Sequence, residues 1–169
     1  PKVDGIVTRL TKTIEYLVKN GDDVIVFCPE GSPSNYKGAK IVGVAAMPLP
    51  LYPELKLGLP GPAVSEALEE FQPDLIHVVN PAVLGLGGIW LAKTNNIPLI
   101  ASYHTHLPKY LEHYGMGMLE PLLWELLKAA HNQALLNLCT STAMVNELES
   151  KGIQRTALWQ RGVDTNSFK

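Results

Sequence analysis

Short apolar blocks follow one another along the chain with two spacings, one typical of helices and one typical of buried strands. Between Ile6 and Asn20 apolar residues recur at helical spacing, and Asn20-Gly21 supplies a stop signal. Elsewhere, short apolar runs bounded by Gly, Pro, Asn or Asp predict strands. The pattern predicts helices over 6–20, 64–71, 82–93, 118–130 and 143–151, and strands over 23–28, 40–44, 74–79, 97–102, 135–140 and 155–159.

Strands that alternate with helices at short spacing predict an α/β fold with a doubly wound, Rossmann-like parallel sheet. The alternation begins with a helix, whereas a doubly wound half begins with its central strand. We therefore expect a further strand immediately before Pro1 in the complete protein. A chain of 169 residues has the size of one domain, so we interpret residues 1–169 as a single domain cut at both ends.

Two segments are open to more than one interpretation. Residues 47–62 contain five prolines, so we predict an extended surface loop, long enough to suggest a function. Residues 118–130 predict an amphipathic helix whose leucine-rich stripe can face a membrane or the core, and base rates favour the core.

Composition narrows the classes of partner. The formal net charge is -2 and the pI is about 6.2, so no basic excess points to nucleic acid or anionic lipid. Apolar stretches such as 81–92 are shorter than the roughly 20 residues that a spanning helix needs. Cys28 and Cys139 each close an apolar run, which is typical of reduced, buried thiols.

Ligands of open parallel sheets bind outside the carboxyl ends of the strands, so the loops there carry the candidate site. Gly5 directly precedes the first helix, where a phosphate could reach the free amides of Ile6 and Val7, although a glycine there is more often a simple turn. His104 and His106 follow a predicted strand. They can donate hydrogen bonds to a sugar or phosphate, hold zinc with further ligands, or serve the structure alone.

Other chemistry finds little support in the sequence. His77 and His131 lie inside predicted elements, and we interpret both as structural. The chain has no Gly-x-Gly-x-x-Gly, Walker or Gly-x-Ser-x-Gly motif, and neither cysteine lies on a candidate loop. No paired carboxylates occur there, which is typical of a transferase that relies on its substrates for the proton transfer.

Several segments resemble the family 4 glycosyltransferases, namely 1–10, 73–81, Ser-Tyr-His-Thr-His at 102–106 and Arg-Gly-Val-Asp at 161–164. Within that family, the segments 48–56 and 103–110 look like those of the sulfoquinovosyl transferases of cyanobacteria and chloroplasts. The resemblance implies a GT-B fold of two facing Rossmann-like domains. This chain would be the amino-terminal, acceptor-side domain, and the second domain, which holds most of the nucleotide-sugar, would lie beyond Lys169.

The resemblance also implies an activity. The full-length enzyme would transfer sulfoquinovose from UDP-sulfoquinovose to diacylglycerol with retention, without a metal or other cofactor, and this chain alone would be inactive. His104 would be the catalytic residue. The remaining site residues are expected to bind the donor (Gly5, Ile6, Thr105 and Arg161) or the acceptor (Tyr52, Lys56, Tyr103 and His106).

Two alternatives remain at this point. A related enzyme could use UDP-glucose or GDP-mannose on a lipid or sugar acceptor, because the first domain does not contain the donor pocket. The chain could also be a non-catalytic module that binds a lipid or a partner. For the enzyme, the resemblance implies an intracellular protein in peripheral contact with a membrane, in a cyanobacterial cell or at the chloroplast envelope.

Overall fold

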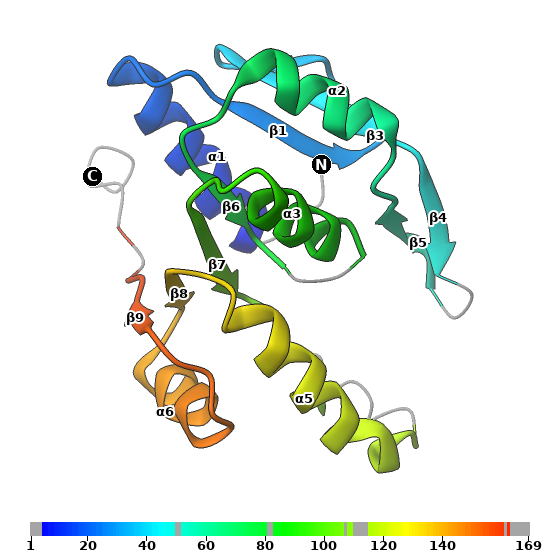
Figure 1. Cartoon of the computed structure of the whole chain (residues 1–169), viewed down its shortest axis with the longest axis vertical. Helices are drawn as coiled ribbons and strands as arrows, with labels where there is room; N and C mark the ends of the chain where they lie inside the picture. Colours follow the sequence, from blue (N-terminus) through cyan, green and yellow to red (C-terminus); the bar gives the residue numbers. More distant parts are fainter. Residues whose placement is uncertain are drawn as a thin grey trace, which may run out of the picture. The chain divides into compact units, whose positions relative to one another are not determined.

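The structure is a computed structural model (Figure 1), and the chain divides into two compact units, residues 1–74 with 82–91 and residues 75–81 with 92–169. For residues 49 and 52–56 it describes the backbone without the side chains. The residues that it describes are 5–49, 52–80, 83–106, 108–109, 115–160 and 162.

The first unit contains a small sheet and helices that pack with it. Strand β1 (Ile25–Pro29) pairs in parallel with β3 (Ala39–Val44), and the short β2 (Asn35–Tyr36) pairs with β3 in the antiparallel sense. Its core joins Val44 of β3 to Val64 of α2 (Pro62–Phe71) and Leu91 of α3 (Val83–Thr94). Helix α1 (Gly5–Lys19) precedes β1, as the spacing predicted.

The proline-rich segment corrects the prediction of an irregular loop. Strands β4 (Ala46–Leu49) and β5 (Tyr52–Gly58) form an antiparallel hairpin with an irregular register between Pro48 and Leu49. A two-stranded ribbon leaves one edge of each strand unpaired, so a proline can stand where no ladder hydrogen bond is needed. The prolines therefore do not exclude strands in this segment, as the prediction from the sequence had assumed.

The second unit is a parallel sheet whose strands lie in the order β6-β7-β8-β9. The strands are β6 (Ile76–Val78), β7 (Leu99–Tyr103), β8 (Leu136–Cys139) and β9 (Thr156–Leu158). Helix α5 (Glu120–His131), which follows the turn η1 (Gly117–Leu119), connects β7 to β8, and α6 (Thr142–Ser150) connects β8 to β9. This confirms the α/β class with a parallel sheet. The strand expected before Pro1 lies outside the described residues.

Helix α5 buries only part of the apolar stripe that the sequence predicted, namely Leu127 and Ala130, with Leu123 packed against the core. Trp124, Leu127, Ala130 and His131 are buried, and Trp124 and Leu127 join the core of the second unit. The rest of the predicted stripe is exposed, with accessible fractions of 88% for Met118, 44% for Leu119, 60% for Leu122 and 59% for Leu126. The large ring of Trp124 turns the helix, since burying it removes more apolar area than burying one leucine.

Two further features can be compared with the sequence. Cys28 and Cys139 are both free thiols, but Cys139 is buried whereas Cys28 is only partly buried. Burial, together with the charge of Glu149, raises the pKa of Cys139 to about 11. None of the described helices is long and apolar enough to cross a membrane.

Candidate functional site

The candidate site of the second unit begins where β7 ends. Parallel strands place their carboxyl ends at one edge of the sheet, and β7 brings Ser102, Tyr103 and then His104 to that edge. Side chains of successive strand residues point to opposite faces, so Ser102 and Tyr103 enter different surroundings. This alternation separates a polar cluster from a core residue.

Tyr103 is a core residue. It is 2% exposed and packs with Trp124, Leu127 and Cys139, with its ring stacked on Trp124 at a centroid distance of 6.5 Å. Burial raises the pKa of its hydroxyl above the ordinary range, and the charge of Glu147 adds to the rise. The predicted contact between Tyr103 and an acceptor finds no support in this placement.

The polar cluster consists of two imidazoles joined by one hydroxyl. The Oγ of Ser102 lies 2.9 Å from Nε2 of His77 and 2.9 Å from Nε2 of His104. Ser102 is fully buried, and its Oγ is also 3.5 Å from the carbonyl oxygen of Val79. The ring of Trp159, just beyond β9, lies 5.8 Å from each imidazole between centroids.

The cluster holds His77 in its neutral form. Burial, together with the smaller effect of the neighbouring His104, lowers the pKa of His77 from 6.5 to about 4. Near neutral pH, His77 is therefore a hydrogen-bonding group with a single ring proton. His77 was interpreted as structural from its place in a strand, and the structure puts it in contact with the residue that carries the predicted chemistry.

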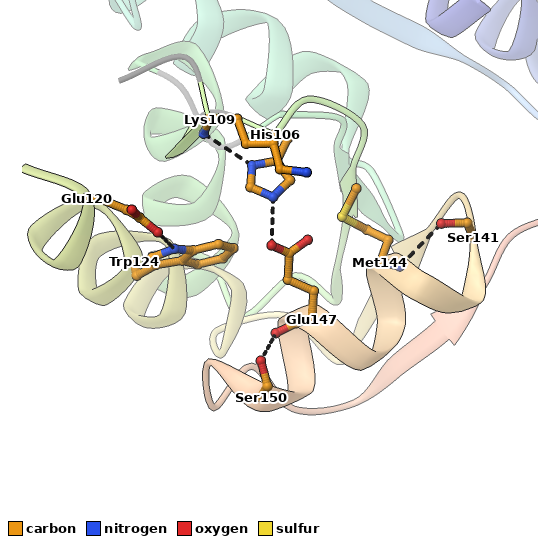
Figure 2. A network of polar contacts seen from close by, with 8 residues as sticks. All are labelled: His106, Lys109, Glu120, Trp124, Ser141, Met144, Glu147 and Ser150. Atoms are coloured by element: carbon orange, nitrogen blue, oxygen red, sulfur yellow. Dashed lines mark hydrogen bonds and ion pairs between the residues drawn. The ribbon is translucent and has the colours of Figure 1, made fainter. Parts of the chain in front are cut away.

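His106 lies two residues after His104 but enters another network (Figure 2). Its Nε2 is 2.7 Å from Oε1 of Glu147 on α6, and its Nδ1 accepts a hydrogen bond from the backbone N–H of Lys109 at 3.3 Å. Its ring also lies edge-on to Trp124, with centroids 5.9 Å apart. Both ring nitrogens are thus engaged within the chain, so the predicted acceptor contact of His106 has no support here. Thr105, which lies between the two histidines in the sequence, is partly buried.

His131 has the structural role that the sequence predicted. It is fully buried in α5, and its Nδ1 lies 2.7 Å from Oδ1 of Asn137. The side-chain amide nitrogen of Asn137 donates hydrogen bonds to the backbone carbonyls of His131 and Gln154. Burial lowers the pKa of His131, opposed by the bond to Asn137. Its ring packs against Tyr103 on the core side of the sheet.

The remaining predicted site residues belong to the first unit or to segments outside the description. Helix α1 begins at Gly5, one residue earlier than predicted, and Ile6 is its second residue. Tyr52 and Lys56 lie on β5, where the backbone alone is described, and Arg161 lies outside the described residues. Their predicted ligand contacts stay predictions.

The first unit also carries an open apolar groove of about 540 Å³ at the start of α2. Gly87 of α3 allows Pro60 to approach closely, because a Cβ added at Gly87 would lie 2.4 Å from Cβ of Pro60. Trp90, which is 63% exposed, forms one wall with Leu91, and Ser65 of α2 contributes a hydroxyl to the lining. Among the described residues, no group of three or more His, Cys, Asp or Glu side chains is placed to hold a metal ion.

Sequence reasoning missed Ser102 and Trp159. Ser102 lies in an apolar strand, and its importance comes from the imidazoles on either side of it, which the spacing along one chain does not reveal. Trp159 follows the last strand in sequence and reaches His77 only through the parallel order of the sheet.

The comparisons with known proteins agree on a family. The model described as Glycosyltransferase Family 4 matches residues 3–167. The chain is 34% identical to a GDP-mannose-dependent alpha-mannosyltransferase of Corynebacterium glutamicum, over 99% of this chain and 42% of that protein. It is also 34% identical to the sulfoquinovosyl transferase SQD2 of Arabidopsis thaliana, over 98% of this chain and 34% of that protein.

A more distant relative is an alpha-monoglucosyldiacylglycerol synthase of Streptococcus pneumoniae, 32% identical over 70% of this chain and 27% of that protein. The chain therefore spans less than half the length of these curated relatives. No solved structure matches the chain significantly.

Proposed function

This chain belongs to glycosyltransferase family 4, and we propose that the complete protein transfers a sugar from a nucleotide-sugar donor to an acceptor. The match of the family model to residues 3–167 carries the proposal. The chain is the amino-terminal, acceptor-side domain of that enzyme, and a second domain holds most of the nucleotide. On this proposal the chain alone is inactive.

The preferred reaction is the transfer of sulfoquinovose from UDP-sulfoquinovose to diacylglycerol with retention. The likeness to a sulfoquinovosyl transferase over nearly the whole chain supports the donor, and the likeness to an alpha-monoglucosyldiacylglycerol synthase of Streptococcus pneumoniae supports a diacylglycerol acceptor. The open groove beside Trp90 supports an acyl acceptor, because it is apolar and accessible.

The second candidate is transfer of mannose from GDP-mannose. It is favoured by an equal identity of 34% to the mannosyltransferase of Corynebacterium glutamicum. A UDP-glucose enzyme stays a further possibility of the same class, and a non-catalytic binding module is the alternative of another class. The residues that would distinguish these donors lie in the second domain of the complete protein.

The mechanism follows from the charge that develops on the departing nucleotide. Amides at the start of α1, at Gly5 and Ile6, stabilise this charge, together with the cationic Arg161. His104 donates a hydrogen bond that orients the sugar, with Thr105 beside it. The described site offers no carboxylate pair, so the departing phosphate takes the proton of the acceptor on the face that it leaves. No metal takes part in these steps.

The enzyme acts at a membrane surface as a peripheral protein, intracellular by its resemblance to the cyanobacterial and chloroplast enzymes. The exposed apolar side chains of Met118, Leu122 and Leu126 on η1 and α5 support such contact, because a face of this kind can enter the headgroup region of a bilayer.

The test is transfer of radiolabelled sugar by the full-length protein to diacylglycerol in mixed micelles. UDP-sulfoquinovose, UDP-glucose and GDP-mannose serve as parallel donors. Transfer from UDP-sulfoquinovose alone is expected. Transfer from another donor would support the glycosyltransferase assignment but contradict sulfoquinovose as the transferred sugar. No transfer from any of these donors to lipid or sugar acceptors would favour the non-catalytic binding module.

A further inference from the structure

We propose that Glu147 is a positioning residue for sugar transfer, because through His106 it fixes the far end of the two-residue segment His104-Thr105. In the proposed function this segment contacts the sugar nucleotide, so the inference rests on the proposed function for its effect on turnover. The anchoring itself rests only on the geometry of the second unit. The two parts can therefore be tested separately.

The near end of the segment is fixed by the sheet. Tyr103, the last residue of β7, pairs with Cys139 of β8 and is 2% exposed. The chain therefore leaves the sheet from a buried position in the ladder. His104 and Thr105 alone separate Tyr103 from His106 in the sequence. A segment of two residues that is held at both ends has few backbone conformations available.

The far end is fixed by four contacts of the His106 ring (Figure 2). Nε2 lies 2.7 Å from Oε1 of Glu147, and the backbone N–H of Lys109 donates to Nδ1 at 3.3 Å. The ring also meets Trp124 and Tyr103 edge-on, at centroid distances of 5.9 Å and 6.3 Å. The side chain of His106 is 15% exposed, so its polar contacts lie in surroundings where a hydrogen bond is stronger than in water.

Glu147 supplies the strongest of these polar contacts. A carboxylate can only accept, so Nε2 of His106 donates to it whether or not the ring carries a second proton. A hydrogen bond to a charged acceptor is about twice as strong as one between neutral groups. The contact with Lys109 is longer, and that N–H is shared with the carbonyl oxygen of His106 at 3.1 Å. Removing the carboxylate therefore releases the ring more than losing the Lys109 contact would.

Helix α6 gives this carboxylate a rigid support. The hydroxyl of the N-cap residue Ser141 accepts a hydrogen bond from the backbone N–H of Met144 at 3.2 Å. Leu148, the next residue after Glu147, is fully buried in the core of the second unit. A residue on a packed helix holds its partner more precisely than a residue on a loop. The helix thus fixes His106, and His106 fixes the segment before it.

The consequence for transfer is one of orientation. Once His106 is released, His104 and Thr105 are held at one end only, and the productive conformation becomes one of several. A group that must reach its position within a fraction of an ångström loses rate when its backbone moves. In the proposed function the second domain still holds most of the nucleotide, so the loss falls on kcat rather than on the KM for the donor.

The anchoring is read by nuclear magnetic resonance of the full-length protein with ¹⁵N-labelled threonine. The signal of Thr105 is assigned by its loss in Thr105→Ser. Its amide order parameter is expected to be about 0.85 in the wild type and to fall below about 0.6 in Glu147→Ala. Thr142, the first residue of α6, is the internal control and should stay rigid in both proteins. A Thr105 amide that is equally rigid in both would overturn the anchoring.

Two conservative variants separate the reach of the side chain from its charge. Glu147→Gln keeps an oxygen at the same distance from Nε2 of His106, and Thr105 is expected to stay rigid. Glu147→Asp keeps the charge but is shorter by one methylene, so it is expected to behave like Glu147→Ala. If Glu147→Ala does not fold, this pair decides: a Thr105 amide that is no more mobile in Glu147→Asp than in Glu147→Gln would contradict the proposal.

Turnover then links the anchor to transfer. Glu147→Ala is expected to lower kcat about tenfold for whichever of UDP-sulfoquinovose, UDP-glucose or GDP-mannose the wild type uses, with the donor KM changed less than about twofold. Glu147→Gln should restore most of this loss. Glu149→Ala is the matched control and should keep the wild-type kcat, because Glu149 is an exposed glutamate of the same helix whose carboxylate accepts from Oγ1 of Thr156.

The remaining outcomes are equally decisive. An unchanged kcat in Glu147→Ala with a mobile Thr105 would contradict the role of the anchor in transfer. An equal loss of kcat in Glu149→Ala would reduce Glu147 to a stabilising residue of α6. If the wild type transfers no sugar, the proposed function fails, while the Thr105 amide still decides whether Glu147 anchors the segment.

Discussion

His106 and Glu147 are joined by a contact of 2.7 Å between Nε2 and Oε1, which ties the segment after β7 to helix α6 (Figure 2). The side chain of His106 is 15% exposed and that of Glu147 33%, so water screens the pair only in part. The backbone N–H of Lys109 donates to Nδ1 of the same ring. The pair therefore holds the loop that begins with His104.

Replacing Glu147 by alanine should destabilise the protein. The change leaves the N–H of His106 without its acceptor, and we expect a loss of about 1 kcal/mol in the free energy of unfolding. Glu125→Ala is the matched control, because Glu125 is an exposed helix glutamate paired with Lys128. Urea unfolding followed by tryptophan fluorescence measures both. Equal stability of the two variants would contradict the role given to the His106–Glu147 pair.

Acid should destabilise the fold through His77. Its folded pKa of about 4 is below its ordinary value of 6.5, so between these values the unfolded chain binds a proton that the folded chain does not. Stability should fall as the pH drops through this window, by roughly 2–3 kcal/mol from His77, and no further below pH 4 from this group. Burial lowers the pKa of His131 too, which adds in the same direction.

The variant His77→Gln checks this assignment, because glutamine can still donate to Ser102 but does not titrate. Urea unfolding from about pH 7 to about pH 4.5 should show a smaller loss of stability in the variant than in the wild type. Identical pH dependence would assign the acid sensitivity to other groups.

Truncation of two neighbouring leucines of α5 should have very different effects on the free energy of unfolding. Leu127 is 3% exposed and packs in the core, so Leu127→Ala should cost about 2–4 kcal/mol of stability. Leu126 is 59% exposed, and Leu126→Ala should change stability by less than about 0.5 kcal/mol. Thermal unfolding of both variants decides. A large loss in Leu126→Ala would mean that the face of α5 has been assigned incorrectly.

The apolar groove beside Trp90 should affect the acceptor more than the donor. Trp90→Ala removes an exposed wall of the groove and should raise the KM for diacylglycerol by about fivefold or more, with the KM for the sugar nucleotide unchanged. Leu86→Ala is the control, since Leu86 is half exposed on the same helix but does not line the groove. Equal acceptor KM values in the wild type and Trp90→Ala would remove the groove from the acceptor site.

Most elements could be predicted because their apolar spacing is local. The helix ending near Asn20 and the strand leading to His104 needed only a few neighbouring residues. The hairpin over 46–58 was missed because a proline is judged as a strand breaker, whereas the free edges of a two-stranded ribbon accept it. The buried face of α5 was predicted in part, through Leu127 and Ala130, and Trp124 was missed because it lies outside the leucine stripe.

The candidate site was predicted only in part for a related reason. His104 was found because polar residues at the carboxyl end of a parallel strand point to the site. Tyr103 and His106 were grouped with it by their closeness in sequence, while the pleat and the turn send them into the core and toward Glu147. Ser102, His77 and Trp159 come together only when the strands are ordered in space.

The most direct test of the account is the kinetics of sugar transfer by the full-length wild type and its His104→Ala variant. The account predicts a loss of turnover of about 10²-fold or more, with folding preserved as judged by circular dichroism. Asn95→Ala, an exposed change in the same unit, should transfer sugar at the wild-type rate. Full turnover in His104→Ala would contradict the role of the cluster at the end of β7.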